Sequence, residues 1–445
     1  MVVLDLPERE ADIEAPKKME SNYDSPLVSS TKPSPPGTSL LRCGTGEEVV
    51  KRLRSEFSRR QELFPRDPAA MVIVKPNLNS NLDALTGNTT DLRVLGATLT
   101  LLRESGYTNV TVADGPNGGF HRDGVSVFER NRVDHLAKRF GYRALDVNCT
   151  TSSNTVLFDA SGEANIADIF CKCDFFVNIP KLKTHYETVM SVALKSLIGV
   201  LVGQYNKSKA HASLIENILR LNDRIQANLH IVDGLVAMEG TGPSAGTPIR
   251  MDILIVGTDP YEIDILAGRV AGFAPSDLPL IRHALDTGRI NSDLIQKVAA
   301  LDVNGFEAKF APAKPRLLAR LAVAPAVKGL VRTIRNSPPV DRLLKNERVR
   351  RRLFAVGLTQ EVILRRERRT TIVFDSRRCK SCGKCARYCP LLRALPDAFG
   401  SADDDCLDCL YCYEVCPSGA IRLQGDPGYY SEQQRRYGRI VREIA

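Results

Sequence analysis

Eight of the twelve cysteines in this chain lie between Cys379 and Cys416, in two runs with the same spacing. Each run reads C-x2-C-x2-C-x3-C-P. Three thiolates at this spacing wrap one face of a cubane iron–sulfur cluster, while the fourth cysteine crosses over to the neighbouring cluster. The runs therefore predict two [4Fe-4S] clusters, one held by Cys379, Cys382, Cys385 and Cys416 and the other by Cys406, Cys409, Cys412 and Cys389.

Two zinc ribbons are the alternative interpretation, because paired CxxC units also bind zinc. A zinc site needs only four ligands, however, and gives no reason for a third cysteine and a proline in each run. Metal-ligand spacing argues for a reducing compartment in which thiolates persist, so we expect a cytoplasmic protein. The N-terminus shows no secretory signal, and the longest apolar stretch, 190–203, contains Lys195 and is too short to span a membrane.

The cysteine region, residues 371–425, resembles the bacterial two-cluster ferredoxins. The resemblance implies a small α+β cluster domain that exchanges electrons with a soluble donor or acceptor protein. One departure from that pattern is the long insert 391–405 between the two runs, which we expect to shield or reposition a cluster.

The length of 445 residues predicts more than one domain. Residues 1–40 are rich in charge, Ser and Pro, and we expect a disordered tail there. Residues 41–304 carry the pattern of an α/β domain, and 305–370 that of a basic helical connector. After the cluster domain at 371–425, residues 426–445 are expected to form a short C-terminal tail.

Short apolar runs alternate with helical stretches throughout the α/β region. This alternation predicts a mostly parallel sheet with helices on both faces. The expected strands are 71–74, 110–113, 175–178, 229–232 and 253–256. The expected helices are 91–105, 125–140, 213–223 and 261–272.

Nearly every expected strand is followed by a short polar segment. The ligand crevice of an open parallel sheet lies outside the carboxyl ends of its strands, so these segments should converge on one site. A strand followed by Asp-Gly is usually only a turn, and each segment alone is weak evidence. The candidate residues are Lys75, Asn77, Asp114, Lys181, Lys183, His185, Lys195, Asp233, Glu239 and Asp259.

The lysines of this set could bind a carboxylate or a phosphate, which predicts a small anionic substrate. The acidic residues could hold a divalent cation or transfer protons. We assign catalytic roles to Lys75, Asp233 and His185, and the alternative for His185 is a structural imidazole. A solvated loop is the alternative for the lysines. The expected substrate-binding residues are Asn77, Asp114, Lys181, Lys183, Lys195 and Asp259.

A family resemblance rests on residues 74–77, 178–185, 194–199, 233–234 and 257–260. With these segments, the region from about residue 70 to 275 resembles the family catalogued as domain of unknown function 362. Members of that family often carry a ferredoxin module, as this chain does. The resemblance implies a shared α/β domain and a redox role, but it brings no established substrate.

The net charge of +9 comes from one segment, since residues 312–370 hold 16 Lys or Arg against 4 Asp or Glu. Such a segment beside a cluster domain could steer an acidic redox partner, or it could be a solvated helical surface. Nucleic-acid binding is disfavoured because aromatic residues are scarce there. No complete GxGxxG or GxxxxGK[ST] motif is present, which disfavours classical dinucleotide binding and P-loop hydrolysis.

The leading hypothesis is an iron–sulfur oxidoreductase that passes electrons through two [4Fe-4S] clusters to a small anionic substrate at the α/β domain. One alternative is a ferredoxin-like electron carrier or partner subunit without its own catalysis. A second alternative is a non-redox enzyme whose clusters serve structure or sensing. The sequence leaves open whether a flavin or an additional metal binds.

Overall fold

The computed structural model describes residues 37–117, 124–313, 346, 348–349, 352–353, 366–399 and 406–445. The expected N-terminal tail up to residue 36 lies outside the described residues, as does nearly all of the expected connector between 314 and 365. Strand β1 (Ser39–Arg42) begins inside the segment expected to be a tail and pairs with the central sheet.

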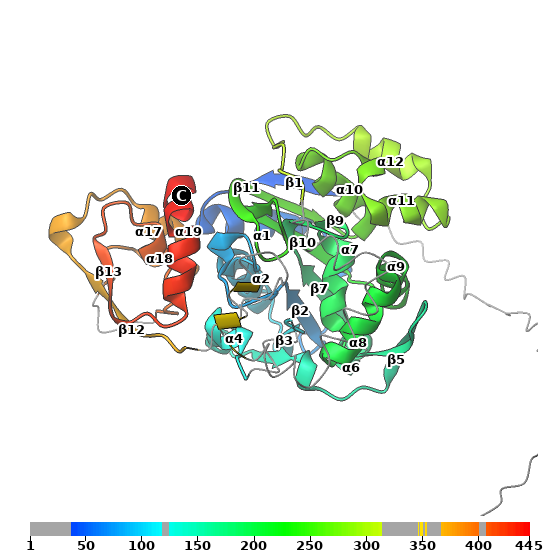
Figure 1. Ribbon diagram of the computed structural model, residues 1–445, viewed down its shortest axis with the longest axis horizontal. Helices are drawn as coiled ribbons and strands as arrows, with labels where there is room; N and C mark the ends of the chain where they lie inside the picture. Colours follow the sequence, from blue (N-terminus) through cyan, green and yellow to red (C-terminus); the bar gives the residue numbers. More distant parts are fainter. Residues whose placement is uncertain are drawn as a thin grey trace, which may run out of the picture. The chain divides into compact units, whose positions relative to one another are not determined.

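A mixed sheet, nine-stranded in the described part of the chain, forms the centre of the α/β domain (Figure 1). Its main path runs β1-β11-β10-β7-β2-β3-β4, and β8 and β9 extend it from β10. The pairs from β10 through β7, β2 and β3 to β4 are parallel, so the predicted mostly parallel sheet is confirmed. The strands are β2 (Val72–Pro76), β3 (Val110–Asp114), β4 (Arg143–Asp146), β7 (Phe175–Ile179), β8 (Lys181–His185), β9 (Val189–Ser191), β10 (Leu229–Glu239) and β11 (Thr247–Gly257).

Strand β11 departs from the parallel arrangement, because it pairs antiparallel with both β10 and β1. Only residues 240–246 connect β10 to β11, and a connection this short makes a hairpin rather than a parallel crossover. The end of β11 at Gly257 pairs with His230 near the start of β10. That end therefore lies at the opposite edge of the sheet from the carboxyl ends of the parallel strands.

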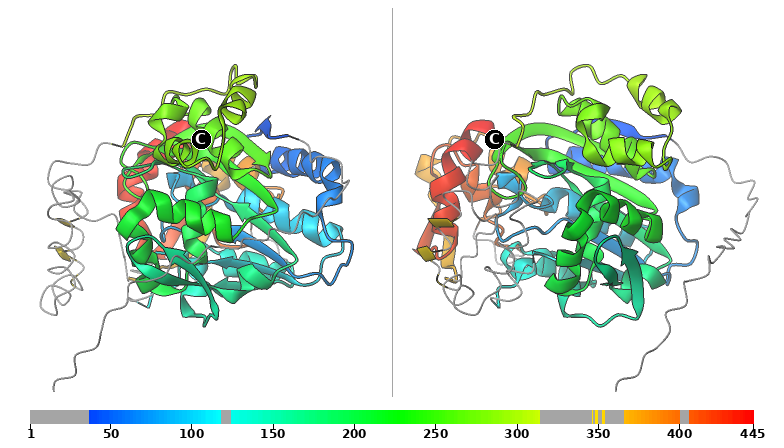
Figure 2. Two further views of the ribbon diagram at one scale, coloured as in Figure 1. Left: turned by 90° about the vertical axis from the view of Figure 1, so that its right-hand side faces the viewer. Right: turned by 45° about the vertical axis from the view of Figure 1, so that its right-hand side comes forward.

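Helices cover both faces of the sheet, as the views in Figures 1 and 2 show. Val72 and Val74 of β2 pack into one apolar layer, and Ile73 between them packs into the other, as alternation along a strand requires. The first layer holds α1 (Gly46–Arg59), α2 (Leu92–Glu104), α4 (Val127–Arg130) and α5 (Val133–Arg139). The opposite layer holds α6 (Asp168–Lys172), α7 (Ala193–Ser196), α8 (Gly203–Ala210), α9 (Leu214–Arg224), α10 (Pro260–Val270), α11 (Pro279–Asp286) and α12 (Ser292–Ala299). A separate hairpin of β5 (Asn154–Phe158) and β6 (Gly162–Ile166) packs on the same side.

The cluster module is built on an antiparallel pair of strands, β12 (Arg369–Phe374) and β13 (Ile421–Asp426). Two short helices, α17 (Lys384–Tyr388) and α18 (Tyr411–Glu414), each contain the third cysteine of their run. Strand, helix and loop together give the small α+β unit that the sequence predicts.

Most of the segment expected to be a C-terminal tail folds into helix α19 (Tyr430–Ile444). Tyr437 and Val441 of this helix are buried in the same apolar layer as α1 and α2, and Gln433 is buried beside them along the helix. Residues 430, 433, 437 and 441 share one face at helical spacing, and this face attaches the end of the chain to the α/β domain. The sequence interpretation as a tail overlooked that periodicity.

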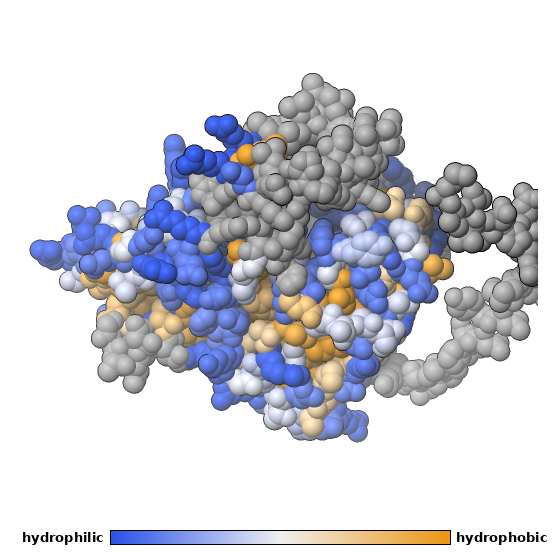
Figure 3. Space-filling model, turned by 60° about the horizontal axis from the view of Figure 1, so that its bottom comes forward, coloured by the Kyte–Doolittle hydropathy of each residue, from blue (hydrophilic) through white to orange (hydrophobic). Residues whose placement is uncertain are grey.

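Figure 3 shows a face on which hydrophilic side chains predominate and hydrophobic ones gather in a smaller area. The large apolar residues most exposed in the described part of the chain are Leu157, Tyr205, Leu285 and Leu392. Within that part, no helix combines the length and the apolar character needed to cross a membrane.

Candidate functional site

The two cysteine runs fold into loops of matching conformation. Ser381 and Asp408, two residues after the first cysteine of each run, both have left-handed backbones with φ of 49° and 53°. Their N–H groups donate to that first cysteine's sulfur, from Ser381 to Cys379 Sγ at 3.4 Å and from Asp408 to Cys406 Sγ at 3.3 Å. Each loop therefore curls around its own cysteines and offers a backbone donor to a thiolate.

The first three cysteines of the second run line an apolar cavity together with Cys389 of the first run. The cavity is also lined by Ile372, Leu391, Leu395, Phe399 and Leu407, so the described part of the insert, 391–399, forms part of its wall. Cys389 thus lies with Cys406, Cys409 and Cys412, in the arrangement expected from crossover of the fourth cysteine.

This donor set fits a [4Fe-4S] cluster. Burial raises the pKa of the Cys409 and Cys412 thiols, and the neighbouring cysteines raise it further. Four thiolates packed this closely repel one another, and the positive charge of the irons is what would stabilise them. Of the cysteines assigned to the other cluster, Cys382 is exposed, and Cys379, Cys385 and Cys416 are half-buried.

The lysines and acids predicted at the strand ends form a buried ion-pair network. Lys75 Nζ, at the end of β2, lies 2.8 Å from Asp114 Oδ1, at the end of β3. Asp114 Oδ2 accepts from the Leu78 N–H at 2.8 Å. Gly199 lies directly against this pair, because a Cβ at that position would come within 2.9 Å of Lys75 Nζ. The Lys75–Asp114 ion pair is therefore buried between Leu78 and Gly199.

A second pair lies on the neighbouring strands. Lys181 Nζ, on β8, is 2.8 Å from Asp233 Oδ2, on β10, and both side chains are fully buried. Lys183 Nζ donates to Asn77 Oδ1 at 2.8 Å and to the Asn88 carbonyl at 3.0 Å. Burial lowers the pKa of the Lys183 ammonium well below its ordinary value, and the nearby Lys195, Lys181 and Lys75 lower it further. The structure thus brings the predicted lysines together with Asp114 and Asp233.

Burial also lowers the pKa of three further basic side chains near these ion pairs. It lowers the pKa of Lys195 to about 8 and that of Lys207 to about 8. It lowers the pKa of His185 well below the ordinary imidazole value, and the His185 Nδ1 accepts from the Glu187 N–H at 3.1 Å. A neutral, hydrogen-bonded imidazole is the structural role named above as the alternative to catalysis for His185.

Three further polar residues join this network without having been singled out from the sequence. Ser196 Oγ accepts from Lys75 Nζ at 3.2 Å and donates to Asn178 Oδ1 at 2.9 Å. Asn178 Nδ2 lies 3.1 Å from His230 Nδ1. Burial lowers the pKa of His230 to about 3, so this imidazole is neutral. A histidine inside the apolar run 229–232 is a signal in the sequence that could have indicated it.

Two predicted acids do not reach the network. Asp259 follows β11 at the opposite edge of the sheet, where its Oδ1 accepts from the Tyr261 N–H at 2.8 Å and caps α10. Its assignment to substrate binding is corrected by the antiparallel direction of β11. Glu239, at the end of β10, accepts from the Ala311 N–H at 2.7 Å. Within the described ranges, no three His, Cys, Asp or Glu side chains gather as they would around a single metal ion, and this holds for the four cysteines that line the apolar cavity as well.

One short segment connects the buried ion pairs Lys75–Asp114 and Lys181–Asp233, here called the strand-end network, to the loop of the second cysteine run, the second cluster loop. Tyr411, on α18, accepts a hydrogen bond through its hydroxyl from the Leu92 N–H at 3.4 Å. The preceding residue, Asp91, donates its N–H to Asp233 Oδ2 at 2.6 Å. Thr90, before it, donates its hydroxyl to the Ile179 carbonyl at 2.8 Å. Consecutive residues thus contact the buried acid on one side and the cluster module on the other.

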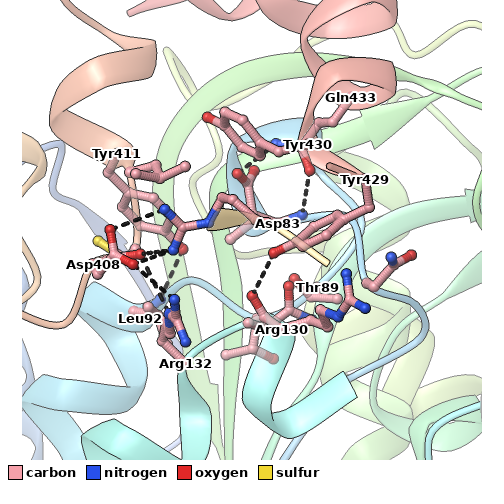
Figure 4. A pocket seen from close by; sticks show the side chains of 17 residues that line it. Asp83, Thr89, Leu92, Arg130, Arg132, Asp408, Tyr411, Tyr429, Tyr430 and Gln433 are labelled. Atoms are coloured by element: carbon pink, nitrogen blue, oxygen red, sulfur yellow. Dashed lines mark hydrogen bonds and ion pairs between the residues drawn. The ribbon is translucent and has the colours of Figure 1, made fainter. Parts of the chain in front are cut away.

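A pocket opens at this junction (Figure 4). Its walls come from the segment 81–92, from the end of α4 and the turn after it, from Arg368 just before β12, from the second cluster loop, and from the start of α19. Tyr411, Leu92, Arg132, Asp408 and Gln433 are seen around it in Figure 4, with dashed lines joining Tyr411 to Leu92 and Arg132 to Asp408. The pocket therefore adjoins Cys409, one of the predicted cluster ligands.

The cysteine loops, their cavity and the docked α/β domain together define an iron–sulfur protein. Residues 371–417 match the model of the 4Fe-4S dicluster domain. Residues 72–269, within the α/β domain, match the family described as Domain of unknown function (DUF362), as the sequence resemblance indicated.

Two known proteins are similar to parts of the chain. The thylakoid-associated protein sll1697 of Synechocystis is 27% identical over 228 residues, which cover 48% of this chain and 66% of that relative. The lactate racemase apoprotein of Thermoanaerobacterium thermosaccharolyticum matches 52% of this chain and 56% of its own, at 14% identity and a TM-score of 0.32.

Proposed function

We propose that the protein is an oxidoreductase with two [4Fe-4S] clusters, which passes electrons through them to a small anionic substrate at the α/β domain. Electrons come from a soluble low-potential donor protein. Each cluster carries one electron, so the pair supplies two, and a substrate that gains two electrons takes its two protons from solvent. The proposed location is cytoplasmic, in keeping with thiolate ligands.

The observation that carries this proposal is the docking of the second cluster loop on the strand-end network. Tyr411 contacts Leu92, and the adjacent Asp91 contacts Asp233, so the cluster loop and the buried network contact consecutive residues of one segment. Arg93, which follows Leu92 in α2, lies over the ring of Tyr388 with its Cζ 4.4 Å from the ring centroid. An electron on the second cluster is thus held next to the α/β domain.

The exposure of the cysteines supports a direction of transfer. None of the ligands assigned to the first cluster is buried, whereas two ligands of the second cluster, Cys389 and Cys412, are buried and one, Cys406, is exposed. An external donor protein would approach the first cluster, and the second cluster would face inward. A pure electron carrier remains the second candidate, because an exposed first cluster serves exchange between proteins equally well.

Single-turnover reoxidation separates the two candidates. The anaerobic holoprotein is reduced with dithionite, freed of excess reductant, and mixed with a deproteinated metabolite extract or with oxidised ferredoxin. We expect the extract to reoxidise the clusters, and we expect the double variant Lys181→Gln/Asp233→Asn to lose at least about 90% of that rate with unchanged iron content. Reoxidation by ferredoxin alone, at equal rates in the wild type and the double variant, would refute the oxidoreductase and support the electron carrier.

A further inference from the structure

The pocket between the cluster module and the α/β domain contains buried amides that the chain does not satisfy. Asn81 is 1% exposed, and neither its Oδ1 nor its Nδ2 has a hydrogen-bond partner in the described structure. Asn131 is 8% exposed; its Nδ2 donates to the Ser80 carbonyl at 2.8 Å, but its Oδ1 has no partner there. Both side chains line the pocket. An unsatisfied buried polar group is unfavourable, so two such amides beside one pocket point to a polar molecule bound there.

The charges around the pocket favour an anion. Arg130, Arg132 and Arg368 line it, against the two carboxyl groups of Asp83 and Asp408. Arg132 and Arg368 both pair with Asp408, so one carboxylate faces two guanidinium groups. Burial raises the pKa of the Asp83 carboxyl, which reduces the negative charge that opposes an incoming anion.

The unpaired atoms specify what else the anion must carry. The Oδ1 atoms of Asn81 and Asn131 are hydrogen-bond acceptors, and they need a donor on the ligand. The Asn81 Nδ2 is a donor and suits an oxyanion oxygen. A carboxylate without a hydroxyl, or a halide, would leave the two Oδ1 atoms unsatisfied.

We propose that this pocket binds a small oxyanion that carries at least one hydroxyl group. Its charge faces the three arginines, and its hydroxyl donates to Asn81 or Asn131. Cys409 and Tyr411 line the same pocket, so the anion lies beside the second cluster. The identification of this anion as the electron acceptor rests on the proposed function, whereas its binding does not.

Calorimetric titration of the oxidised holoprotein tests binding without turnover. The probes are glycolate and acetate, which differ in a hydroxyl group, and inorganic phosphate, each at an ionic strength held constant with chloride. We expect glycolate and phosphate to bind, and glycolate to bind at least about fivefold more tightly than acetate, since a hydrogen bond to a buried acceptor contributes that much.

Three variants locate the binding. Asn81→Leu should weaken glycolate binding about tenfold, and it should raise the melting temperature of the ligand-free protein because it removes an unsatisfied buried amide. Arg132→Gln should weaken glycolate and acetate alike. Arg54→Gln is the matched control, because Arg54 also pairs with a carboxylate, Glu104 Oε2 at 2.5 Å, but does not line the pocket.

Equal binding of glycolate and acetate, or unchanged glycolate binding in Asn81→Leu, would overturn the proposal and leave only water in the pocket. Binding as expected, without reoxidation of reduced clusters by any acceptor in the metabolite extract, would uphold the pocket and refute the oxidoreductase. Reoxidation by the extract at an unchanged rate in Asn81→Leu, together with no detectable glycolate binding, would uphold the oxidoreductase and refute the anion pocket.

Discussion

Lys181→Met removes the cation from the buried Lys181–Asp233 pair and leaves the carboxylate in place. Removing one partner of a buried ion pair costs about 3–5 kcal/mol, because the remaining charge stays in surroundings of low dielectric. Asp233 keeps two donors, the Asp91 N–H at 2.6 Å and the Leu235 N–H at 3.0 Å. We therefore expect a loss near the lower limit, about 3 kcal/mol of the free energy of unfolding.

The stability deficit of Lys181→Met should depend on pH. Burial raises the pKa of Asp233, and Lys181 opposes that rise, so the pKa should climb further in Lys181→Met. A carboxyl whose pKa is higher in the folded state binds more protons there, and stability falls as pH rises from about 4 through the folded pKa. The deficit of the variant should thus be smallest near pH 4 and grow toward neutral pH.

Urea denaturation of the oxidised holoprotein, followed by circular dichroism, measures the deficit. Adding Asp233→Asn should recover about half of it, because the amide removes the stranded charge but satisfies only one of the two N–H donors. Arg54→Gln breaks an exposed pair and should cost less than about 1 kcal/mol. A Lys181→Met protein as stable as Arg54→Gln, or a deeper loss on adding Asp233→Asn, would refute the reasoning.

Anaerobically purified protein should contain about eight irons and eight acid-labile sulfides, with Cys379→Ala damaging one cluster and Cys406→Ala the other; zinc without labile sulfide would contradict this. The Lys207 pKa of about 8 disfavours the charged form in the fold, so the melting temperature should rise relative to Lys207→Met between pH 8 and about 10.5. Asp259→Ala should lower the free energy of unfolding by about 1 kcal/mol through loss of a helix cap, while cluster reoxidation stays unchanged.

The strand-end site was partly predictable because its residues follow their strands directly in the chain. Lys75 and Asp114 end β2 and β3, and parallel neighbours bring such positions together. Asp259 has the same local pattern after β11, but only the direction of that strand decides which edge it reaches. Direction depends on the length of the connection from β10, and the expected strands 229–232 and 253–256 were too short to reveal a hairpin.

The pocket could not be predicted from local pattern, because its walls come from five separate parts of the chain. Asn81 is adjacent to no strand end, and Arg368 and Asp408 meet across the cluster module. Gln433 reaches Asp83 at 2.5 Å only because α19 folds back onto the α/β domain. Long-range pairings of this kind leave no periodic signal in a single sequence. The cysteine loops are the opposite case, since their ligands lie within a few residues of one another.

Helix α2 contains one glycine, Gly96, whose position indicates how closely the cluster module docks. Glycine inside a helix costs about 1 kcal/mol relative to alanine, so its presence there usually has a packing reason. A Cβ at Gly96 would lie 3.3 Å from the Pro390 carbonyl oxygen, next to the predicted ligand Cys389. A Cβ at Gly46, at the start of α1, would likewise lie 3.3 Å from the Cys389 carbonyl oxygen. These two glycines let the cluster loop approach the α/β domain.

Gly96→Leu should therefore displace the cluster module without damaging its clusters. We expect unchanged iron and sulfide content and unchanged reduction by dithionite, because the cysteines lie outside α2. Reoxidation by the metabolite extract should slow by about tenfold or more, since small displacements of reacting groups cost rate steeply. Gly96→Ala is the graded control, because a single methyl group needs a shift of only a few tenths of an ångström and the better helix former offsets part of that cost. A Gly96→Leu protein reoxidised as fast as the wild type would show that docking is not needed for transfer, and the carrier hypothesis would then explain the clusters better.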